Sequence, residues 1–426
     1  MAQIFQWLQR LRESRDGSMW AMADQLVVSG GNFATTFVLM HLLPTASFGT
    51  YALINTVILV ANGFHANMII CPLVVYGVQE RDFPYRRYPT AALLFSSALF
   101  PVWLALIVAT SVYLRQILPG FAAALAVLFW QFQETTRRTL FAVGQHRTAL
   151  WGDIISYPMQ AILIWVVMHF LHGQLGACFV VMAVTSFAAA LLQAWQGRLQ
   201  ILSGASLLSI YNEFWTIAKW MILTSLAGFA SAPLLPWLLN WARGREAVAA
   251  FQAILSIMNL TNPLVLSIPA IVIPAVAAGR YSVRQAFWRY TIQFELFMAP
   301  FLFFLFFFPR WALMHLCGNH PEYFEQTTAL RIGVCACLLA VPLSVLQNLF
   351  AAIKQTRNNA IVQSIGVGCS LLIAPVLVYF AGIVGTIQAE VFARLLKTIG
   401  AGLLLQRIKL NSAPETSQQA TPAEAQ

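Results

Sequence analysis

The sequence predicts an all-α polytopic membrane protein with about twelve transmembrane helices. Only 9% of its 426 residues are charged and 59% are hydrophobic, whereas soluble domains carry roughly 25% charged residues. Apolar stretches of about 18–25 residues recur along the chain, and each is long enough to cross about 30 Å of hydrocarbon as a helix. The ten-residue alternation typical of transmembrane β-barrels is not found in the sequence.

The expected elements begin with a short basic segment, 1–18, in which apolar residues recur at helical spacing between arginines. This pattern predicts an amphipathic helix lying on the membrane surface. Twelve spans are expected after it, at 20–43, 50–77, 90–114, 119–143, 148–170, 173–196, 214–240, 246–275, 286–308, 326–353, 358–381 and 383–406. The remaining segment, 411–426, is polar and rich in Pro, Ala and Gln, which predicts a disordered tail.

The two halves of the chain resemble each other. The segment "WAMADQLVVSGGNFA" (20–34) aligns with "WTIAKWMILTSLAGF" (215–229), and "LFAVGQHR" (140–147) aligns with "LFAAIKQTR" (349–357). These matches predict a six-helix N-lobe, 19–200, and a six-helix C-lobe, 201–410. Because six is an even number, the two copies are expected to insert with the same orientation, related by an axis along the membrane normal.

The distribution of basic residues indicates both the topology and the type of partner. Far more arginines and lysines fall in the loops on one side of the expected spans than on the other. The positive-inside rule therefore places both termini in the cytoplasm. The net charge of +10 does not indicate nucleic-acid binding, because the basic residues lie in these short loops.

No metal or other cofactor is expected. The six cysteines mostly lie inside apolar runs, and the C-x-C of Cys335 and Cys337 lacks a second pair of ligands. The loop 309–325 contains His315, His320 and two glutamates, but this combination is typical of a solvated loop.

Polar side chains form stripes inside four of the expected spans. In the first span the stripe is spaced by four, three and four residues, which places its members on one helical face. The stripe residues are Gln25, Ser29, Asn32 and Thr36 in span 1, Asn55 and Asn62 in span 2, Thr224 in span 7, and Gln252, Ser256, Asn259 and Asn262 in span 8. Such residues hydrogen-bond between packed helices, but four stripes at equivalent places favour a water-filled cavity between the lobes.

Charged residues inside spans cost about 2.5–3.5 kcal/mol each on insertion scales and therefore need a reason. Span 12 carries Glu390, Arg394 and Lys397 on one face. Glu390 and Arg394 can form an i,i+4 pair, and the positive charge that remains suits a phosphate-bearing ligand, since Arg binds phosphate through two parallel hydrogen bonds. Glu295 in span 9 and Asp153 in span 5 are alternative proton or cation sites.

Two further pairs of charges are expected near the cytoplasmic side. Asp24 and Lys219 occupy equivalent positions at the ends of spans 1 and 7, and we expect a salt bridge between them when the cytoplasmic mouth is closed. Glu134 and Arg138 are spaced i,i+4 near the end of span 4, where a solvated face is expected.

The first third of the chain resembles a known family. Residues 20–53, "WAMADQLVVSGGNFATTFVLMHLLPTASFGTYAL", look like the opening of Wzx-type polysaccharide flippases, which belong to the multidrug/oligosaccharidyl-lipid/polysaccharide (MOP) exporter superfamily. The similar pieces are A-D-Q at the start of span 1, S-G-x-N-F after it, and F-G-x-Y-A-L (48–53). The later "RRTLFAVGQHRTALWGD" (137–153) is similar to the family's loop between spans 4 and 5.

The resemblance implies a MATE-like fold and a flippase function. Such a protein turns polyprenyl-diphosphate-linked oligosaccharides from the cytoplasmic to the periplasmic leaflet of the bacterial inner membrane, for O-antigen (lipopolysaccharide) or exopolysaccharide biosynthesis. The resemblance implies alternating access and a central cavity lined by spans 1, 2, 7 and 8, where the polar stripes also lie. Membrane lipids, a polysaccharide polymerase or ligase, and glycosyltransferases are the partners it implies. Arg394 and Lys397 are expected to hold the diphosphate.

Other functions stay open. A proton- or sodium-coupled multidrug antiporter of the same superfamily needs a buried acid, for which Asp24 and Glu295 are candidates, and a largely apolar cavity. A membrane glycosyltransferase, polymerase or ligase usually works through a sizeable outward loop, whereas the longest one expected here, 309–325, is short. A non-transporting assembly factor is the third option. A transporter rather than an enzyme is expected.

Overall fold

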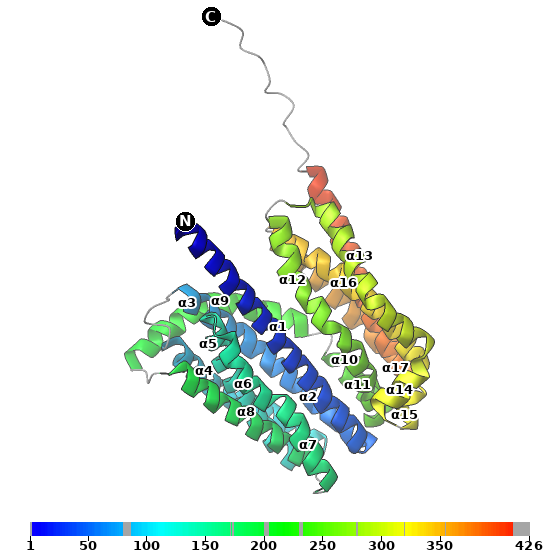
Figure 1. The fold of residues 1–426 in the computed structure, drawn as a ribbon. Coiled ribbons are helices and arrows are strands. Elements are labelled where there is room, and N and C mark those ends of the chain that lie inside the picture. The colour runs from blue at the N-terminus through cyan, green and yellow to red at the C-terminus, as the bar shows by residue number, and fades with distance from the viewer. Residues whose placement is uncertain are drawn as a thin grey trace, which may run out of the picture.

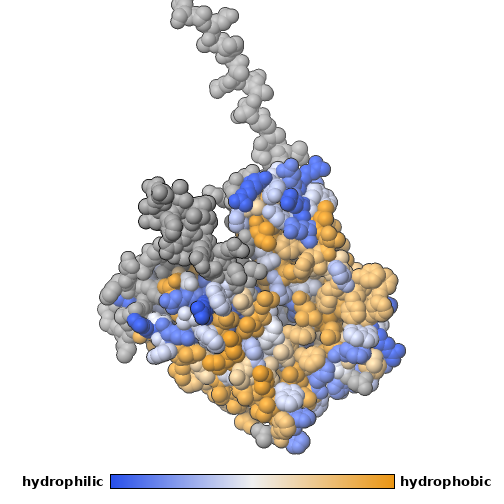
Figure 2. Space-filling view, viewed as in Figure 1, coloured by the Kyte–Doolittle hydropathy of each residue, from blue (hydrophilic) through white to orange (hydrophobic). Residues whose placement is uncertain are grey.

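The computed structural model describes residues 2–79, 87–170, 172, 174–199, 204–229, 233–277, 280–318, 320–353 and 355–411. Throughout these residues the regular secondary structure is helical, which confirms the predicted all-α class (Figure 1). Figure 2 shows a broad apolar surface over the helices, with hydrophilic side chains gathered toward the end that carries the termini and around the opposite end.

The described residues of the N-terminal half, up to residue 199, form eight α-helices and one π-helical turn. They are α1 (Ala2–Leu42), α2 (Thr45–His65), the π-helical turn η1 (Ala66–Ile70), α3 (Cys71–Gln79), α4 (Arg87–Tyr113), α5 (Ile117–Ala142), α6 (His146–Ser156), α7 (Pro158–Phe170) and α8 (Leu175–Gly197). α1 is continuous, so the expected amphipathic segment 1–18 and the first span belong to one helix. α6 ends just before Pro158, whose ring nitrogen cannot donate to the preceding turn.

The C-terminal half begins at residue 204. Its elements are α9 (Gly204–Phe229), α10 (Leu234–Arg243), α11 (Arg245–Met258), the 3₁₀ turn η3 (Asn259–Thr261), α12 (Asn262–Ala277), α13 (Val283–Phe307), α14 (Pro309–Cys317), α15 (Pro321–Phe324), α16 (Thr327–Ala352) and α17 (Thr356–Asn411). α17 consists of two helices that meet at Gly382, which has φ 54°. Gly366 lies against the stem of Lys397 and Gly400 against Val362, so these two helices run antiparallel side by side.

The apolar helices agree with the twelve expected spans. In the part of the chain that is described, nine helical stretches are long and apolar enough to cross a membrane. The last of these, Arg357–Arg407, contains both helices of α17. Two further helical passages are α1 and the pair formed by α9 and α10. The chain is therefore a multi-pass membrane protein, and the boundary predicted between 381 and 383 coincides with Gly382.

Helices of each half pack mainly on one another. In the N-terminal half α5 lies against α4 and α8, and α1 lies against α6 and α7. In the C-terminal half α16 lies against α12, α13 and α17. α9 also packs across the halves, since it lies against η1, α3 and α4 of the N-terminal half as well as against α17 of its own half. There the rings of Tyr76, Tyr88 and Phe214 stack, and the Tyr88 hydroxyl donates to a Glu213 carboxylate oxygen at 2.6 Å.

The two halves meet where α2 packs against α11, toward the end of the molecule remote from the termini (Figure 1). A Cβ on Gly49 would collide with the backbone carbonyl of Arg245, so only glycine permits this approach. Phe48 and Tyr51 are buried beside it, and Phe48 makes an edge contact with Tyr323 at 6.5 Å between ring centroids. The F-G-x-Y-A-L segment (48–53) thus forms the junction between the halves.

Candidate functional site

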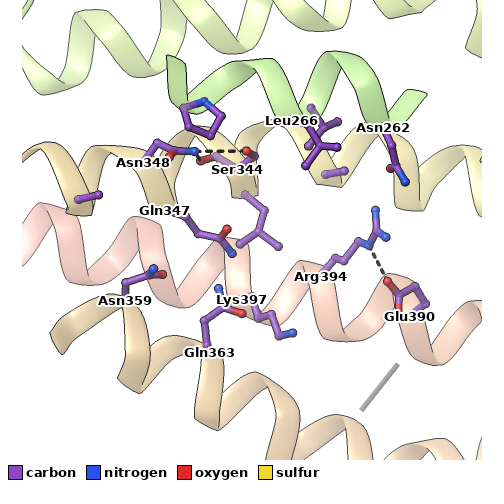
Figure 3. A pocket seen from close by; sticks show the side chains of 15 residues that line it. Asn262, Leu266, Ser344, Gln347, Asn348, Asn359, Gln363, Glu390, Arg394 and Lys397 are labelled. Carbon is purple, nitrogen blue, oxygen red and sulfur yellow. Dashed lines mark hydrogen bonds and ion pairs between the residues drawn. The ribbon is translucent and has the colours of Figure 1, made fainter. Parts of the chain in front are cut away.

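A cavity of about 570 Å³ lies inside the C-terminal half, between α12, α16 and both helices of α17. Figure 3 shows its side chains converging from these elements. The lining residues are Asn262, Val265, Leu266, Pro269, Ala340, Leu343, Ser344, Gln347, Asn348, Ala351, Asn359, Gln363, Glu390, Arg394 and Lys397. The walls therefore combine an apolar side with amides, one hydroxyl and three charges, and two of these charges are positive.

The three charges of the cavity come from one face of the second helix of α17. Arg394 Nε donates to Glu390 Oε1 at 2.8 Å, and Arg394 Nη1 donates to the backbone carbonyl of Ala336 at 2.8 Å. The stem of Lys397 crosses Gly366, where any Cβ would collide with it. In the described part of the chain, the ion pairs include none made by Lys397. The cavity thus has one paired and one unpaired cation.

Amide side chains line the rest of the polar wall. Gln347 and Asn348 come from α16, and Asn359 and Gln363 lie one turn apart near the start of α17. Asn348 Nδ2 donates to the Ser344 carbonyl at 2.8 Å. Asn359 Oδ1 and Gln363 Nε2 are buried and have no hydrogen-bond partner among the described residues. Sequence reasoning missed these amides, although the spacing of four residues between Asn359 and Gln363 repeats the signal used for the first span.

The stripe predicted on the first span lies on the exposed side of α1. Gln25 and Asn32 are exposed, Gln25 Nε2 donates to Ser29 Oγ at 3.3 Å, and Thr36 Oγ1 donates to the Asn32 carbonyl at 3.0 Å. A neighbouring face of α1 is buried, and there Gly31 lies against Tyr157 and Pro158. In this structure Gln25 and Thr36 of the stripe thus donate hydrogen bonds within the helix itself.

The other predicted cavity residues are dispersed. Asn55 and Asn62 are half-buried on α2, with Asn62 Oδ1 buried and lacking a partner among the described residues. Ser256 Oγ donates to the Gln252 carbonyl, and Asn262 Nδ2 donates to Asn259 Oδ1 at 3.0 Å. The side chain of Thr224 lies outside the described residues. Of the predicted set whose side chains are described, only Asn262 lines the cavity, together with Arg394 and Lys397.

A second polar site lies in the N-terminal half, and we name it the Arg137 cluster: Asp24 of α1, Glu134, Arg137 and Arg138 of α5, and Asp153 of α6. Arg137 uses three nitrogens for three acids. Nη2 bonds Asp24 Oδ2 at 2.5 Å, Nε bonds Asp153 Oδ2 at 2.8 Å, and Nη1 bonds Glu134 Oε2 at 3.0 Å. The Asp24 and Asp153 side chains are 0% exposed. Arg138 Nε adds a bond to Glu134 Oε1 at 2.6 Å.

Amides and hydroxyls surround the Arg137 cluster. Gln133 Nε2 donates to Asp153 Oδ1 at 3.1 Å, and Ser156 Oγ donates to Gln133 Oε1 at 2.6 Å. Gln193 of α8 donates to the Ala149 carbonyl at 3.0 Å. Asp24 Oδ1 is buried with no partner among the described residues. With every group ionised, three acids face two guanidiniums, so the cluster has a surplus of negative charge.

The cluster bears on two expectations. In this conformation Asp24 is buried against Arg137, while Lys219 is exposed on α9, which lies against α3 and α4. The bridge expected between Asp24 and Lys219 when the cytoplasmic mouth is closed stays a prediction for that state. Glu134 does not lie on a solvated face, because it is 7% exposed and binds both arginines. The central residue, Arg137, was missed because it was counted among the charges of the following loop.

Glu295 belongs to neither site. It is half-buried on α13, and its Oε2 atom is buried without a partner among the described residues. It is not among the residues that line the cavity. Among the residues that the structure describes, no three His, Cys, Asp or Glu side chains are grouped so that they could hold a metal ion.

The arrangement of helices is shared with known transporters. No family model and no curated protein matches the chain. Among solved structures, an inward-facing multidrug resistance MATE family transporter of the MOP superfamily has a TM-score of 0.69 and 14% identity, covering 92% of this chain and 96% of the other. The lipid II flippase MurJ in an inward closed conformation has a TM-score of 0.69 and 9% identity, covering 92% and 87%.

A third solved structure represents the opposite state. An outward-facing multidrug resistance MATE family transporter has a TM-score of 0.63 and 15% identity, covering 94% of this chain and 95% of the other. At these identities the likeness establishes a common fold. The chain therefore has a MATE-like fold, as the sequence predicts.

Proposed function

We propose that this protein is a flippase that moves polyprenyl-diphosphate-linked oligosaccharides across the bacterial inner membrane, from the cytoplasmic to the periplasmic leaflet. The observation that supports it is the composition of the C-terminal cavity. Two cations, one acid and a row of amides line a cavity whose remaining walls are apolar. A diphosphate needs cationic partners, sugar hydroxyls need amides and hydroxyls, and neither group can cross hydrocarbon without replacing its bound water.

Arg394 and Lys397 are the proposed diphosphate ligands. Lys397 presents three donors on a flexible stem, and no ion pair within the described residues already occupies it. Arg394 keeps Nη2 available while Nε and Nη1 hold Glu390 and the Ala336 carbonyl. The glycan would occupy the amide-lined part of the cavity, while the polyprenyl chain stays in lipid.

Alternating access fits how the two halves are joined. The α2–α11 junction lies toward the end remote from the termini, and the two structural neighbours with the higher TM-score are both inward conformations. With both termini in the cytoplasm, the cavity would load from the cytoplasmic leaflet. Rocking about the junction would then present the head group to the periplasm, where a polymerase or ligase takes it.

The Arg137 cluster is the proposed coupling site. Its surplus acid and the unpartnered Asp24 Oδ1 leave room for one proton or one monovalent cation. Asp24 and Asp153 bind neighbouring nitrogens of one guanidinium, so a proton between them would relieve their repulsion. Transport by Asp24→Asn should lose its dependence on an imposed proton or sodium gradient, whereas an unchanged gradient dependence would exclude this role.

The function is tested by reconstitution. Proteoliposomes would carry a fluorescent polyprenyl diphosphate sugar, and a membrane-impermeant quencher would report its exchange between leaflets. We expect wild type to accelerate exchange and Arg394→Met with Lys397→Met to lower the rate at least tenfold, because each charge-assisted hydrogen bond contributes about 1.5–3 kcal/mol. Arg331→Met is the matched control, since Arg331 is exposed on α16 outside the cavity. Exchange no faster than in protein-free vesicles would refute the proposal.

The second candidate is a proton-coupled multidrug antiporter, which the buried acids of the Arg137 cluster favour. The cavity argues against it, since an organic cation would face Arg394 and Lys397. Deletion of the gene separates the two functions. Loss of surface polysaccharide with accumulation of lipid-linked units supports the flippase, whereas unchanged polysaccharide with raised sensitivity to toxic cations supports the antiporter.

A further inference from the structure

The C-terminal cavity has two chemically different ends. Glu390 and Arg394 lie deep, about two to three helical turns beyond the bend at Gly382. Asn359 and Gln363 lie within the first turns of α17, at the end of the half that carries the C-terminus, and Lys397 lies between the two groups (Figure 3). The charged end and the amide end are therefore separated along the cavity.

The amide end contains unmet hydrogen-bonding capacity. Asn359 Oδ1 and Gln363 Nε2 are buried, and neither has a partner in the described part of the chain. A buried polar atom without a partner costs roughly 1–3 kcal/mol. These two atoms are one acceptor and one donor, one helical turn apart on the same face of α17. A ligand that pairs both of them recovers this cost.

The unpaired atoms select a class of ligand. A diphosphate esterified at both ends is fully ionised at neutral pH, so it only accepts hydrogen bonds and cannot pair with Asn359 Oδ1. A hydroxyl both donates and accepts, and a carboxamide keeps one donating and one accepting edge whichever way it is turned. Two hydroxyls on neighbouring carbons can therefore pair with both amides at once, and every common hexopyranose carries such a pair.

We propose that Asn359 and Gln363 form a sugar subsite that binds vicinal hydroxyls of a pyranose ring, separate from the phosphate ligands Arg394 and Lys397. This inference rests on the proposed function of the same cavity and adds the position and chemistry of glycan recognition. Gln347 faces the space between the two ends and would contact the same sugar (Figure 3). The head group would then lie along the cavity with its diphosphate deep and its sugar near the start of α17.

The test compares two ligands on the purified protein in lipid nanodiscs. One is a C20 polyprenyl diphosphate, and the other is the same lipid with glucopyranose esterified to the diphosphate. Titration calorimetry gives both dissociation constants. We expect the glucosyl lipid to bind wild type more tightly, by about fivefold for each hydrogen bond gained. Asn359→Leu and Gln363→Met keep the side-chain volume and should lose this preference while binding the unglycosylated lipid as wild type does.

Gln388→Leu is the matched control, because Gln388 is a half-buried glutamine of α17 outside the cavity lining, and it should keep the preference. Unchanged binding of the unglycosylated lipid also shows that a variant is folded. Equal affinity of wild type for the two lipids, or a preference that survives in both cavity variants, overturns the sugar subsite and leaves the proposed function standing. If wild type binds neither lipid, the proposed function fails and the subsite fails with it.

Discussion

Replacing Arg137 by methionine should destabilise the protein more than any other single loss of charge in the described structure. Methionine matches the stem of arginine but removes the cation that three acids share. Glu134 keeps Arg138 as a partner at 2.6 Å. Asp24 and Asp153, both 0% exposed, lose theirs. The variant would bury two uncompensated carboxylates.

The loss of stability caused by Arg137→Met can be estimated from two limits. Removing one partner of a buried ion pair costs about 3–5 kcal/mol, because the other charge stays buried. The alternative for each aspartate is to take up a proton, which at pH 7 costs about 4 kcal/mol for a carboxyl with the ordinary pKa of about 3.9. With two orphaned aspartates, Arg137→Met should therefore lower the free energy of unfolding by roughly 3–8 kcal/mol. The loss should shrink on acidification, because protonation neutralises the orphaned acids.

The assay is thermal unfolding in detergent, followed by tryptophan fluorescence at pH 5 and pH 8. Arg137→Met should melt well below wild type, and by a larger margin at pH 8. Neutralising the acids in the triple variant Arg137→Met, Asp24→Asn, Asp153→Asn should restore most of the stability. The melting temperature of Arg137→Lys should lie between those of Arg137→Met and wild type. An ammonium retains the charge but lacks the planar fork that reaches three carboxylates. A melting temperature equal to that of wild type, or no recovery in the triple variant, would refute this account of the cluster.

Two pairs of glycine substitutions test close approaches. Gly31→Ala places a Cβ 2.5 Å from Tyr157 Cβ and should lower the melting temperature, whereas Gly30→Ala meets nothing within 4 Å and should leave it unchanged or raise it, since alanine favours helix by up to about 1 kcal/mol. Gly366→Ala should displace the stem of Lys397 and weaken binding of polyprenyl diphosphate several-fold, as measured by calorimetry. Gly368→Ala, with nothing within 4 Å, should bind as wild type does, and equal affinities for both variants would contradict a positioning role for Gly366.

The sequence allowed the fold class and most helix boundaries to be predicted, because bilayer thickness imposes both. The single residue left between the last two expected spans is Gly382, where the helices of α17 meet. The packing of helices that are distant in the sequence could not be predicted in the same way. The packing of α9 on α3 and α4 of the other half breaks the symmetry that the repeated segments suggest. At this contact Phe214 stacks on Tyr76 and Tyr88, which lie more than a hundred residues earlier in the sequence.

The Arg137 cluster shows a related limit. Spacing along one helix revealed the pair Glu134–Arg138, but Asp24 lies 113 residues before Arg137 and no periodicity connects them. One local signal was overlooked. The run "QFQETTRRT" (131–139) is almost wholly polar, yet it lies within the apolar helix α5 rather than in a loop. Polar residues on every side of a helix at that depth indicate that its neighbours supply partners, which α1, α6 and α8 do.

The sequence predicted a cavity between the lobes, whereas this cavity lies inside the C-terminal half, and three of its lining residues were among those singled out. Arg394 and Lys397 were identified by the cost of placing charge in a span, and the structure brings both to one cavity with Asn262. The amides of α16 and α17 were missed because polar stripes were sought in spans 1, 2, 7 and 8. A single conformation also does not test the residues of α1 and α2. Their exposed stripe would reach a head group only in a state that brings the halves together around it.

The two sites differ in a way that constrains the proposed mechanism. The C-terminal cavity has a surplus of positive charge and unpaired amides, so under the proposed function it would bind an anionic, hydroxyl-bearing ligand. The Arg137 cluster has a surplus of acid, so it attracts a proton or a cation. The substrate and the coupling ion would therefore bind in different halves and would not compete for one site. Under this mechanism, coupling has to pass through the relative movement of the halves, and a ligand at one site can influence the other only by favouring one of those arrangements.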